Sequence, residues 1–137
     1  QMDYRGTPAA VEFAIKTLHV AHVIVVGHSK CGGVRGCHDL YAGDAPQQTV
    51  ESSYVARWLQ ILKPGFDRTV CHADPETRIQ AMEREAVRIS LENLLTYDFV
   101  REAVEQDHLT LHGVWHDIAE GTMEYYDAEA DRFVPIT

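Results

Sequence analysis

The residues best suited to chemistry lie in one short loop, where His28 and Cys31 are separated by two residues. This spacing lets an imidazole nitrogen and a thiolate sulfur converge on one metal ion at about 2.0–2.3 Å. Nitrogen and sulfur donors favour zinc over calcium or magnesium, which prefer oxygen ligands. A catalytic zinc site needs about three protein ligands and one open position, so this pair supplies only part of such a site.

Two glycines follow the pair directly. Gly32 and Gly33 can adopt backbone conformations closed to other residues, and they leave room for a ligand to approach the amide groups. The spacing of His28 and Cys31 is unspecific by itself. A polar loop with an incidental thiol therefore stands as an equal alternative to a metal site.

The elements expected to position this loop are a strand before it and a helix after it. Residues 20–26 are β-branched and almost continuously apolar, which is typical of a parallel strand buried on both faces. Open α/β sheets bind ligands at the carboxyl ends of their strands, where the connecting loops diverge. A short helix is expected over residues 34–41.

The rest of the chain alternates between helices and strands. Apolar residues at helical spacing predict helices over residues 8–18, 50–62, 76–95 and 98–106. Lys63, Pro64 and Gly65 are expected to end the second of these. Alternating polarity predicts a strand over residues 109–118, followed by a hairpin of residues 123–126 and 132–136. The order predicts an α/β fold, a mainly parallel sheet flanked by helices, in one domain over residues 1–137.

The other thiols are interpreted as structural. Cys37 and His38 fall on the helix after the loop and are expected to point away from it, as packing residues. Cys71 lies in an irregular stretch, where a buried or inert thiol is expected. Reactivity at either cysteine would require a lowered thiol pKa, which the sequence does not show.

The other histidines and the helix glutamates are also given ordinary roles. His19 and His22 flank the apolar strand and are interpreted as packing residues. His112 and His116 lie on one side of the strand predicted over residues 109–118 and are given no functional role. The alternative is that one of them assists proton transfer at the surface. The helix over residues 76–95 is expected to expose to solvent its residues Glu83, Glu85 and Glu92.

Composition excludes several classes of function. The 12 Lys and Arg residues against 21 Asp and Glu give a net charge of −9 without a basic cluster, so no nucleic-acid partner is expected. The apolar run over residues 23–26 is far shorter than the roughly 20 residues of a membrane-spanning helix. Three cysteines do not suggest a disulfide framework, and no secretory signal is visible, so a cytoplasmic location is expected.

One family accounts for most of these features together. Residues 12–36, with the helix start Ala-Val-Glu-Phe-Ala-Ile, the strand Val-Ile-Val-Val-Gly and the loop His-Ser-Lys-Cys-Gly-Gly, resemble the second metal motif of the β-class carbonic anhydrases. The similarity continues, in order and over nearly the whole chain, through residues 83–94, 97–101, 109–113 and 117–127.

The resemblance implies roles for four residues. It implies that His28 and Cys31 are zinc ligands and that the amide of Gly32 faces the substrate pocket. Phe13 stands where many family members carry Tyr, so it is a candidate pocket residue, with packing in the first helix as the alternative.

The sequence departs from the family in one respect. The motif Cys-x-Asp-x-Arg, which supplies a further thiolate ligand and an acid–base pair in the family, does not occur in it. The resemblance therefore implies a partial domain, the carboxyl-terminal part, with the amino-terminal part missing. No catalytic residue is identifiable within it.

The function implied is zinc-dependent, reversible hydration of carbon dioxide to bicarbonate and a proton, a step of carbon utilization, in a homodimer or higher oligomer. The alternative is a metal-free, catalytically inactive fragment or binding module that retains the fold. The absent motif favours this alternative for the chain taken alone. A redox-responsive protein using Cys31 and Cys37 is a third interpretation.

Overall fold

The computed structural model describes residues 5–51 and 53–137. Its helical elements, among which η1 is a π-helix and η2 a 3-10 helix, are α1 (Gly6–Glu12), η1 (Phe13–Thr17), α2 (Gly32–Ala42), α3 (Gln47–Glu51), α4 (Ser53–Leu59), η2 (Gln60–Leu62), α5 (Lys63–Arg68), α6 (Pro75–Leu94) and α7 (Asp98–Glu105). Its strands are β1 (His22–His28), β2 (Thr110–Asp117), β3 (Thr122–Asp127) and β4 (Arg132–Pro135). None of the helices it describes is long and apolar enough to cross a membrane.

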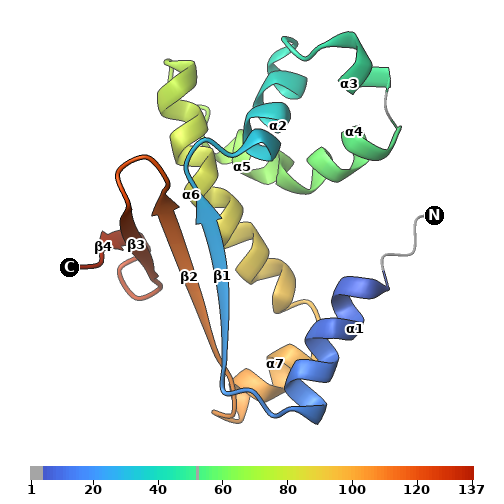
Figure 1. The fold of residues 1–137 in the computed structure, drawn as a ribbon, viewed down its shortest axis with the longest axis vertical. Coiled ribbons are helices and arrows are strands. Elements are labelled where there is room, and N and C mark those ends of the chain that lie inside the picture. Colours follow the sequence, from blue (N-terminus) through green and yellow to red (C-terminus); the bar gives the residue numbers. More distant parts are fainter. Residues whose placement is uncertain (1–4, 52) are drawn as a thin grey trace.

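The strands form one sheet in the order β1-β2-β3-β4 (Figure 1). β1 and β2 are parallel, with His22 opposite Thr110 and His28 opposite His116. The pairs β2–β3 and β3–β4 are antiparallel. The expected α/β class, a sheet flanked by helices, is confirmed. Among the described strands, however, only β1 and β2 are parallel, because the tight turns that join β2, β3 and β4 connect antiparallel neighbours.

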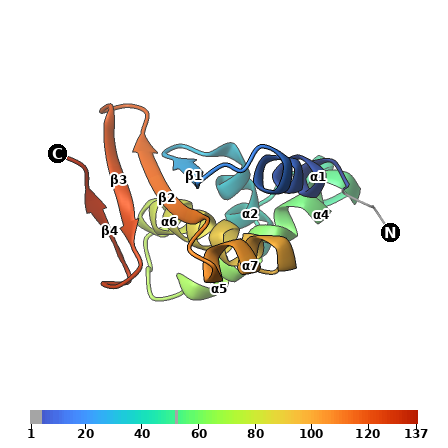
Figure 2. The same ribbon diagram turned by 90° about the horizontal axis from the view of Figure 1, so that it is seen from below.

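Helix α6 lies across one face of β1 and β2 (Figures 1 and 2). It starts where the Asp74 side chain caps it by accepting a 2.8 Å hydrogen bond from the Thr77 backbone N–H. The helix approaches the strands closely where they carry Gly27 and Gly113. A Cβ at either glycine would come within 3.0 Å of a methyl group of Val87.

The opposite face of these strands is open. Burial alternates along β1, and Ile24 and Val26 remain 59% and 60% exposed. The expectation that this strand is buried on both faces is therefore wrong for the chain described here. Helix α6 packs on the side of β1 that carries Gly27, and Ile24 is on the other side; Figure 1 shows α6 along one face of β1.

Two clusters of buried side chains hold the helices. One joins α2, α4 and α6 and consists of Val34, Cys37, Leu59, Ile79 and Met82. The other, at the far end of the sheet, joins η1, α7 and the start of β2 through Ile15, Val100 and Leu109. The first cluster anchors α2, and with it the end of the loop that carries His28 and Cys31.

Most predicted elements are confirmed within a few residues, with one clear exception. Lys63, Pro64 and Gly65 do not end the helical stretch, because they open α5 (Lys63–Arg68). Pro64 sits in the first turn, where its missing N–H removes no helical hydrogen bond. The helix predicted over residues 50–62 spans α3, α4 and η2, and its position 52 lies outside the described residues.

Candidate metal centre

The loop between β1 and α2 is tied to the end of β2. The Ser29 backbone N–H donates to the His116 carbonyl oxygen at 2.9 Å. The Ser29 hydroxyl donates to Asp117 Oδ1 at 3.2 Å and accepts from the Ile118 N–H at 2.9 Å. Lys30 takes a left-handed backbone conformation, with φ 55°, which turns the chain toward α2. The loop is therefore held in place from both strands.

His28 is oriented by a hydrogen bond with its own neighbour. Its Nδ1 lies 2.8 Å from the Ser29 carbonyl oxygen. A carbonyl oxygen can only accept, so Nδ1 carries the proton and Nε2 keeps its lone pair. This is the arrangement by which proteins orient a metal-binding histidine, because a backbone carbonyl fixes both tautomer and ring.

His28 and Cys31 both line one cavity, of about 290 Å³. Cys31 is half-buried at the N-cap of α2 and forms no disulfide. Apolar side chains from β1, α2, η2 and α6 make up most of the wall, together with Trp58 of α4. They include Val26, Val34, Leu62, Ala86 and Val87. The cavity therefore combines two metal donors with an apolar lining.

Glu83 is a polar residue of this cavity that the sequence interpretation missed. It was expected on a solvent-facing side of its helix, yet it is only 3% exposed and lines the cavity. Its Oε2 has no hydrogen-bond partner among the described residues. The sequence feature that could have indicated its burial is its position four residues from both Ile79 and Val87, which are buried on the same side of α6.

The two other predicted site residues lie outside the cavity wall. Gly32 is the first residue of α2, directly beside Cys31, whereas the glycine that lines the cavity after the loop is Gly33. Phe13 opens η1, is 55% exposed, and is not among the residues that line the cavity. The substrate-binding roles of Gly32 and Phe13 stay predictions.

The remaining thiols do not complete the site. Cys37 is fully buried, and burial raises its thiol pKa to about 11 with a further contribution from Asp67, so it stays protonated. Its expected role as a packing residue, shared with His38, is confirmed. Cys71 is exposed rather than buried. Within residues 5–51 and 53–137, no group of three or more His, Cys, Asp or Glu residues is placed to hold a metal ion.

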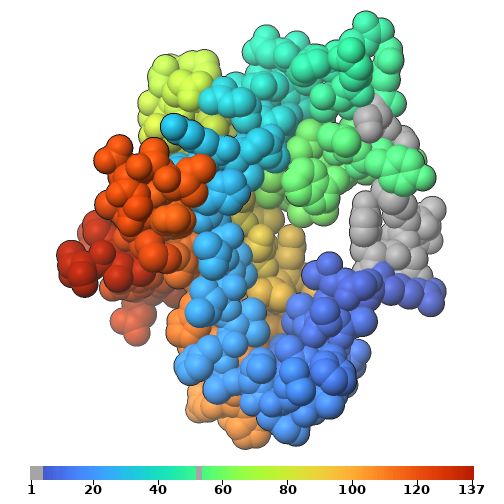
Figure 3. Space-filling model, in the orientation of Figure 1, coloured from blue at the N-terminus to red at the C-terminus, as the bar shows by residue number. Residues whose placement is uncertain are grey.

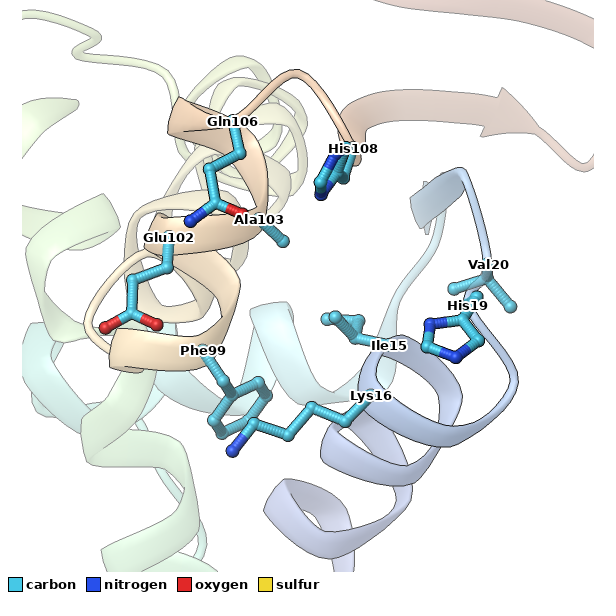
Figure 4. A pocket seen from close by; sticks show the side chains of 9 residues that line it. All are labelled: Ile15, Lys16, His19, Val20, Phe99, Glu102, Ala103, Gln106 and His108. Carbon is cyan, nitrogen blue, oxygen red and sulfur yellow. The ribbon is translucent and has the colours of Figure 1, made fainter.

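Two other hollows are lined by neither His28 nor Cys31, although one of them shares Trp58 with the cavity of the loop. One pocket, of about 470 Å³, lies between η1 and α7, and Figure 4 shows His19 and His108 among the side chains that line it. These histidines precede β1 and β2, so they sit at the amino ends of the strands. Figure 3 shows a second hollow beside α1, of about 520 Å³, lined by residues that include Pro8, Trp58 and Ile61. Neither contains His28 or Cys31.

Comparison with known sequences identifies relatives over most of the chain. The sequence profile of the family described as "Carbonic anhydrase" matches residues 1–123. Beta carbonic anhydrase 3 of Arabidopsis thaliana is 35% identical over 124 residues, which is 88% of this chain and 47% of that protein. The chain thus spans about half the length of this curated relative.

Solved structures give the same result. The β-carbonic anhydrase CcaA superposes with a TM-score of 0.87 at 28% identity, covering 98% of this chain and 60% of that one. A second match comes from a study of two tetrameric β-carbonic anhydrases of the ascomycete Sordaria macrospora. It has a TM-score of 0.71 at 27% identity and covers 87% of this chain and 58% of that one.

Proposed function

Because this chain belongs to the β-class carbonic anhydrase family, we propose that it carries the zinc-binding loop of an enzyme that reversibly hydrates carbon dioxide. His28 and Cys31 would hold the metal in this proposal. The observation that carries it is the hydrogen bond from His28 Nδ1 to the Ser29 carbonyl, which leaves Nε2 out of that bond, in a residue that lines the same cavity as Cys31.

The donor set fits zinc. One imidazole nitrogen and one thiolate sulfur are ligands that zinc takes in both catalytic and structural sites. When bound, zinc supplies Lewis-acid chemistry that lets water lose its proton near neutral pH. The described residues supply two donors, so the remaining protein ligand would have to come from outside residues 5–51 and 53–137.

The surroundings suit the substrate and its product. Carbon dioxide is small and uncharged, and the apolar walls formed by Val34, Ala86 and Val87 offer it a water-poor environment. Bicarbonate is an anion. The first amides of α2, beginning at Gly32, lack intrahelical partners and form the positive end of the helix dipole. They would stabilise negative charge next to the zinc ligands.

The complete protein would be a homodimer or a higher oligomer. The exposed Ile24 and Val26 leave an apolar surface of the kind that a partner covers. A cytoplasmic location also stays a prediction. The second candidate function, a metal-free module that retains the fold, is favoured by the small number of donors in the described residues.

Zinc content after a single substitution tests the proposal. Cys31→Ser, introduced into the complete protein, should lower bound zinc from about one per chain to a small fraction. Removing one of about three protein ligands undermines a tetrahedral site. The measurement is elemental analysis after dialysis against a weak chelator.

Cys71→Ser is the matched control, because Cys71 is exposed and lies outside the cavity. It should retain the zinc of the parent. Undiminished zinc in Cys31→Ser would remove Cys31 from the ligand set. Zinc-free parent protein with an intact fold would favour the metal-free module.

A further inference from the structure

The open face of the sheet carries a pair of histidines that the proposed function does not use. We propose that His22 and His112 form a second metal site, which binds one late first-row divalent transition ion through two imidazole nitrogens. Copper(II) is the preferred ion. The structure places His22 Nδ1 and His112 Nε2 3.0 Å apart.

The sheet holds the two side chains together. His22 begins β1, and His112 lies two residues into the adjacent parallel strand, opposite Ile24. Both side chains project from the same face, because residues two apart along a strand point the same way. The ring centroids are 5.1 Å apart and the ring planes are inclined by 43°. The ladder of paired residues from His22 to His28 fixes the strands that carry them.

The separation of the nitrogens matches that of two adjacent ligands on one metal. Metal–imidazole bonds of about 2.0–2.1 Å, at right-angled to tetrahedral geometry, place two donor nitrogens about 2.8–3.4 Å apart. The observed 3.0 Å lies in this range. Without metal, the same pair shares one proton in an N–H···N hydrogen bond. When a metal binds, the proton of the donor ring moves to the other nitrogen of that ring, so both imidazoles stay neutral, and each ring turns so that its lone pair points about 35–45° away from the partner nitrogen.

In the chain described here, with no partner on the open face of the sheet, the surroundings leave the site accessible and without a competing cation. Both histidines are exposed. They line a surface hollow of about 400 Å³ with apolar residues and two tyrosines, and no Lys or Arg is among the lining residues. A divalent ion therefore meets no cation there. Positions not taken by the two imidazoles stay open for water or an added chelator.

The ion preference follows from the donors. Two neutral imidazoles suit copper, nickel and zinc rather than calcium or magnesium, and affinity for such donors is highest for copper(II). The site is separate from the His28–Cys31 loop. His28 lies six residues along β1 from His22, about 20 Å at the usual rise of a strand.

Copper(II)–iminodiacetate is the probe, because the chelator leaves open positions on the ion that two neighbouring imidazoles can fill together. The titration uses the 137-residue chain carrying Cys31→Ser, which removes the thiolate of the candidate zinc site. We expect one equivalent to bind. An electron paramagnetic resonance spectrum should show two imidazole nitrogens on the copper.

Either His22→Gln or His112→Gln should weaken binding at least about tenfold, because the second imidazole acts at a high effective concentration. The double variant should lose little more than either single one. His108→Gln is the matched control: it removes an exposed histidine outside the pair and should bind like the parent.

Both substitutions are at exposed positions, so each single variant should stay folded, which far-ultraviolet circular dichroism checks. The two variants should lose affinity to a similar extent. Equal affinity of His22→Gln and the parent would overturn the proposal. A spectrum with only one imidazole nitrogen on the copper would also overturn it. So would a parent affinity no better than that of a variant in which His22, His112 and His108 are all replaced by Gln. In those cases the pair is a hydrogen bond only.

Discussion

At the scale of single residues, hydrogen-bond partners decide which groups can act. His28 can offer Nε2 to a metal because its Nδ1 donates a hydrogen bond to the Ser29 carbonyl oxygen. Ser29, directly after β1, fixes that carbonyl by its hydrogen bonds to the end of β2, where Asp117 is its acidic partner. The geometry of the candidate zinc site therefore depends on side chains that do not line it.

Asp117 gives a pH-dependent test of this anchor. Hydrogen bonds from the Ala119 N–H, and then from the Glu120 N–H and the Ser29 hydroxyl, hold the pKa of Asp117 below its usual value. A carboxylate whose pKa is lower in the folded state stabilises the fold above its unfolded pKa of about 3.9. That contribution is lost as the pH falls through the folded pKa. Asp117→Asn should therefore lower the urea midpoint at pH 7, and the difference from the parent should shrink below about pH 4.

Glu129→Gln is the control for this comparison, because Glu129 is exposed on the turn between β3 and β4. Its urea midpoint should follow that of the parent at every pH. A deficit of Asp117→Asn that is the same at pH 7 and pH 3.5 would show that the charge of Asp117 does not anchor the loop.

Thiol reactivity should distinguish the exposed Cys71 from the buried Cys37. Burial raises the pKa of Cys37 to about 11, and only a thiolate attacks an alkylating reagent. Iodoacetamide at pH 8 should modify the exposed Cys71 in the folded chain and leave Cys37 unmodified until urea unfolds it. Peptide mass spectrometry reads each site. Labelling of Cys37 as fast as Cys71 would reopen the redox interpretation that pairs Cys31 with Cys37.

At the scale of elements, the close approach of α6 to the sheet depends on two glycines. Val87 sends one methyl group toward Gly27 in β1 and the other toward Gly113 in β2. An added Cβ would lie 2.5 Å from the first methyl group and 2.8 Å from the second. Because Gly27 directly precedes His28, this contact also sets the distance between α6 and β1 beside the candidate zinc site.

Gly27→Ala and Gly113→Ala should each lower the free energy of unfolding by about 1–3 kcal/mol, the usual penalty for overpacking. The measurement is urea unfolding followed by circular dichroism. Adding Val87→Ala to Gly27→Ala should recover part of the loss, because the two substitutions share one contact. Gly6→Ala is the control, since among the described residues no atom beyond its chain neighbours and its own helix backbone lies within 4 Å of the added Cβ. Strict additivity of Gly27→Ala and Val87→Ala would contradict the proposed contact.

At the scale of the whole molecule, the chain presents one covered and one open face of its sheet. The covered face packs on α6, whereas the open face exposes Ile24 and Val26 together with the histidine pair. The same chain spans about half of its curated relative and 60% of its structural neighbour CcaA. An open apolar face and a candidate metal site with two donors are consistent with such a span.

The 137 residues by themselves should therefore hydrate carbon dioxide no faster than buffer. Two donors do not hold a catalytic zinc ion tightly, and the family's Asp–Arg pair does not occur in this sequence. Stopped-flow measurement with a pH indicator, on protein of confirmed mass, is the assay. Turnover that a zinc chelator abolishes would show that the chain completes the site with residues other than those considered above.

The sequence alone was enough to predict the local features of this protein. The apolar run before His28 and the alternation over residues 109–118 each predict a strand, because each pattern reflects contacts within one element. The glycines after Cys31 were expected in the loop, but they open α2. The long helix over residues 76–95 follows from its spacing in the same way. The family resemblance rests on these same segments.

Only the tertiary structure decided which faces meet. Glu83 is buried because α6 lies with that side toward the cavity, and the sequence spacing that hinted at it was read as a solvated face. His22 and His112 meet because the register of β1 on β2 brings together residues 90 apart in sequence. Helical and strand periods describe one element at a time, whereas register and packing depend on side chains from several. That is why the candidate zinc loop was visible in the sequence and the histidine pair was not.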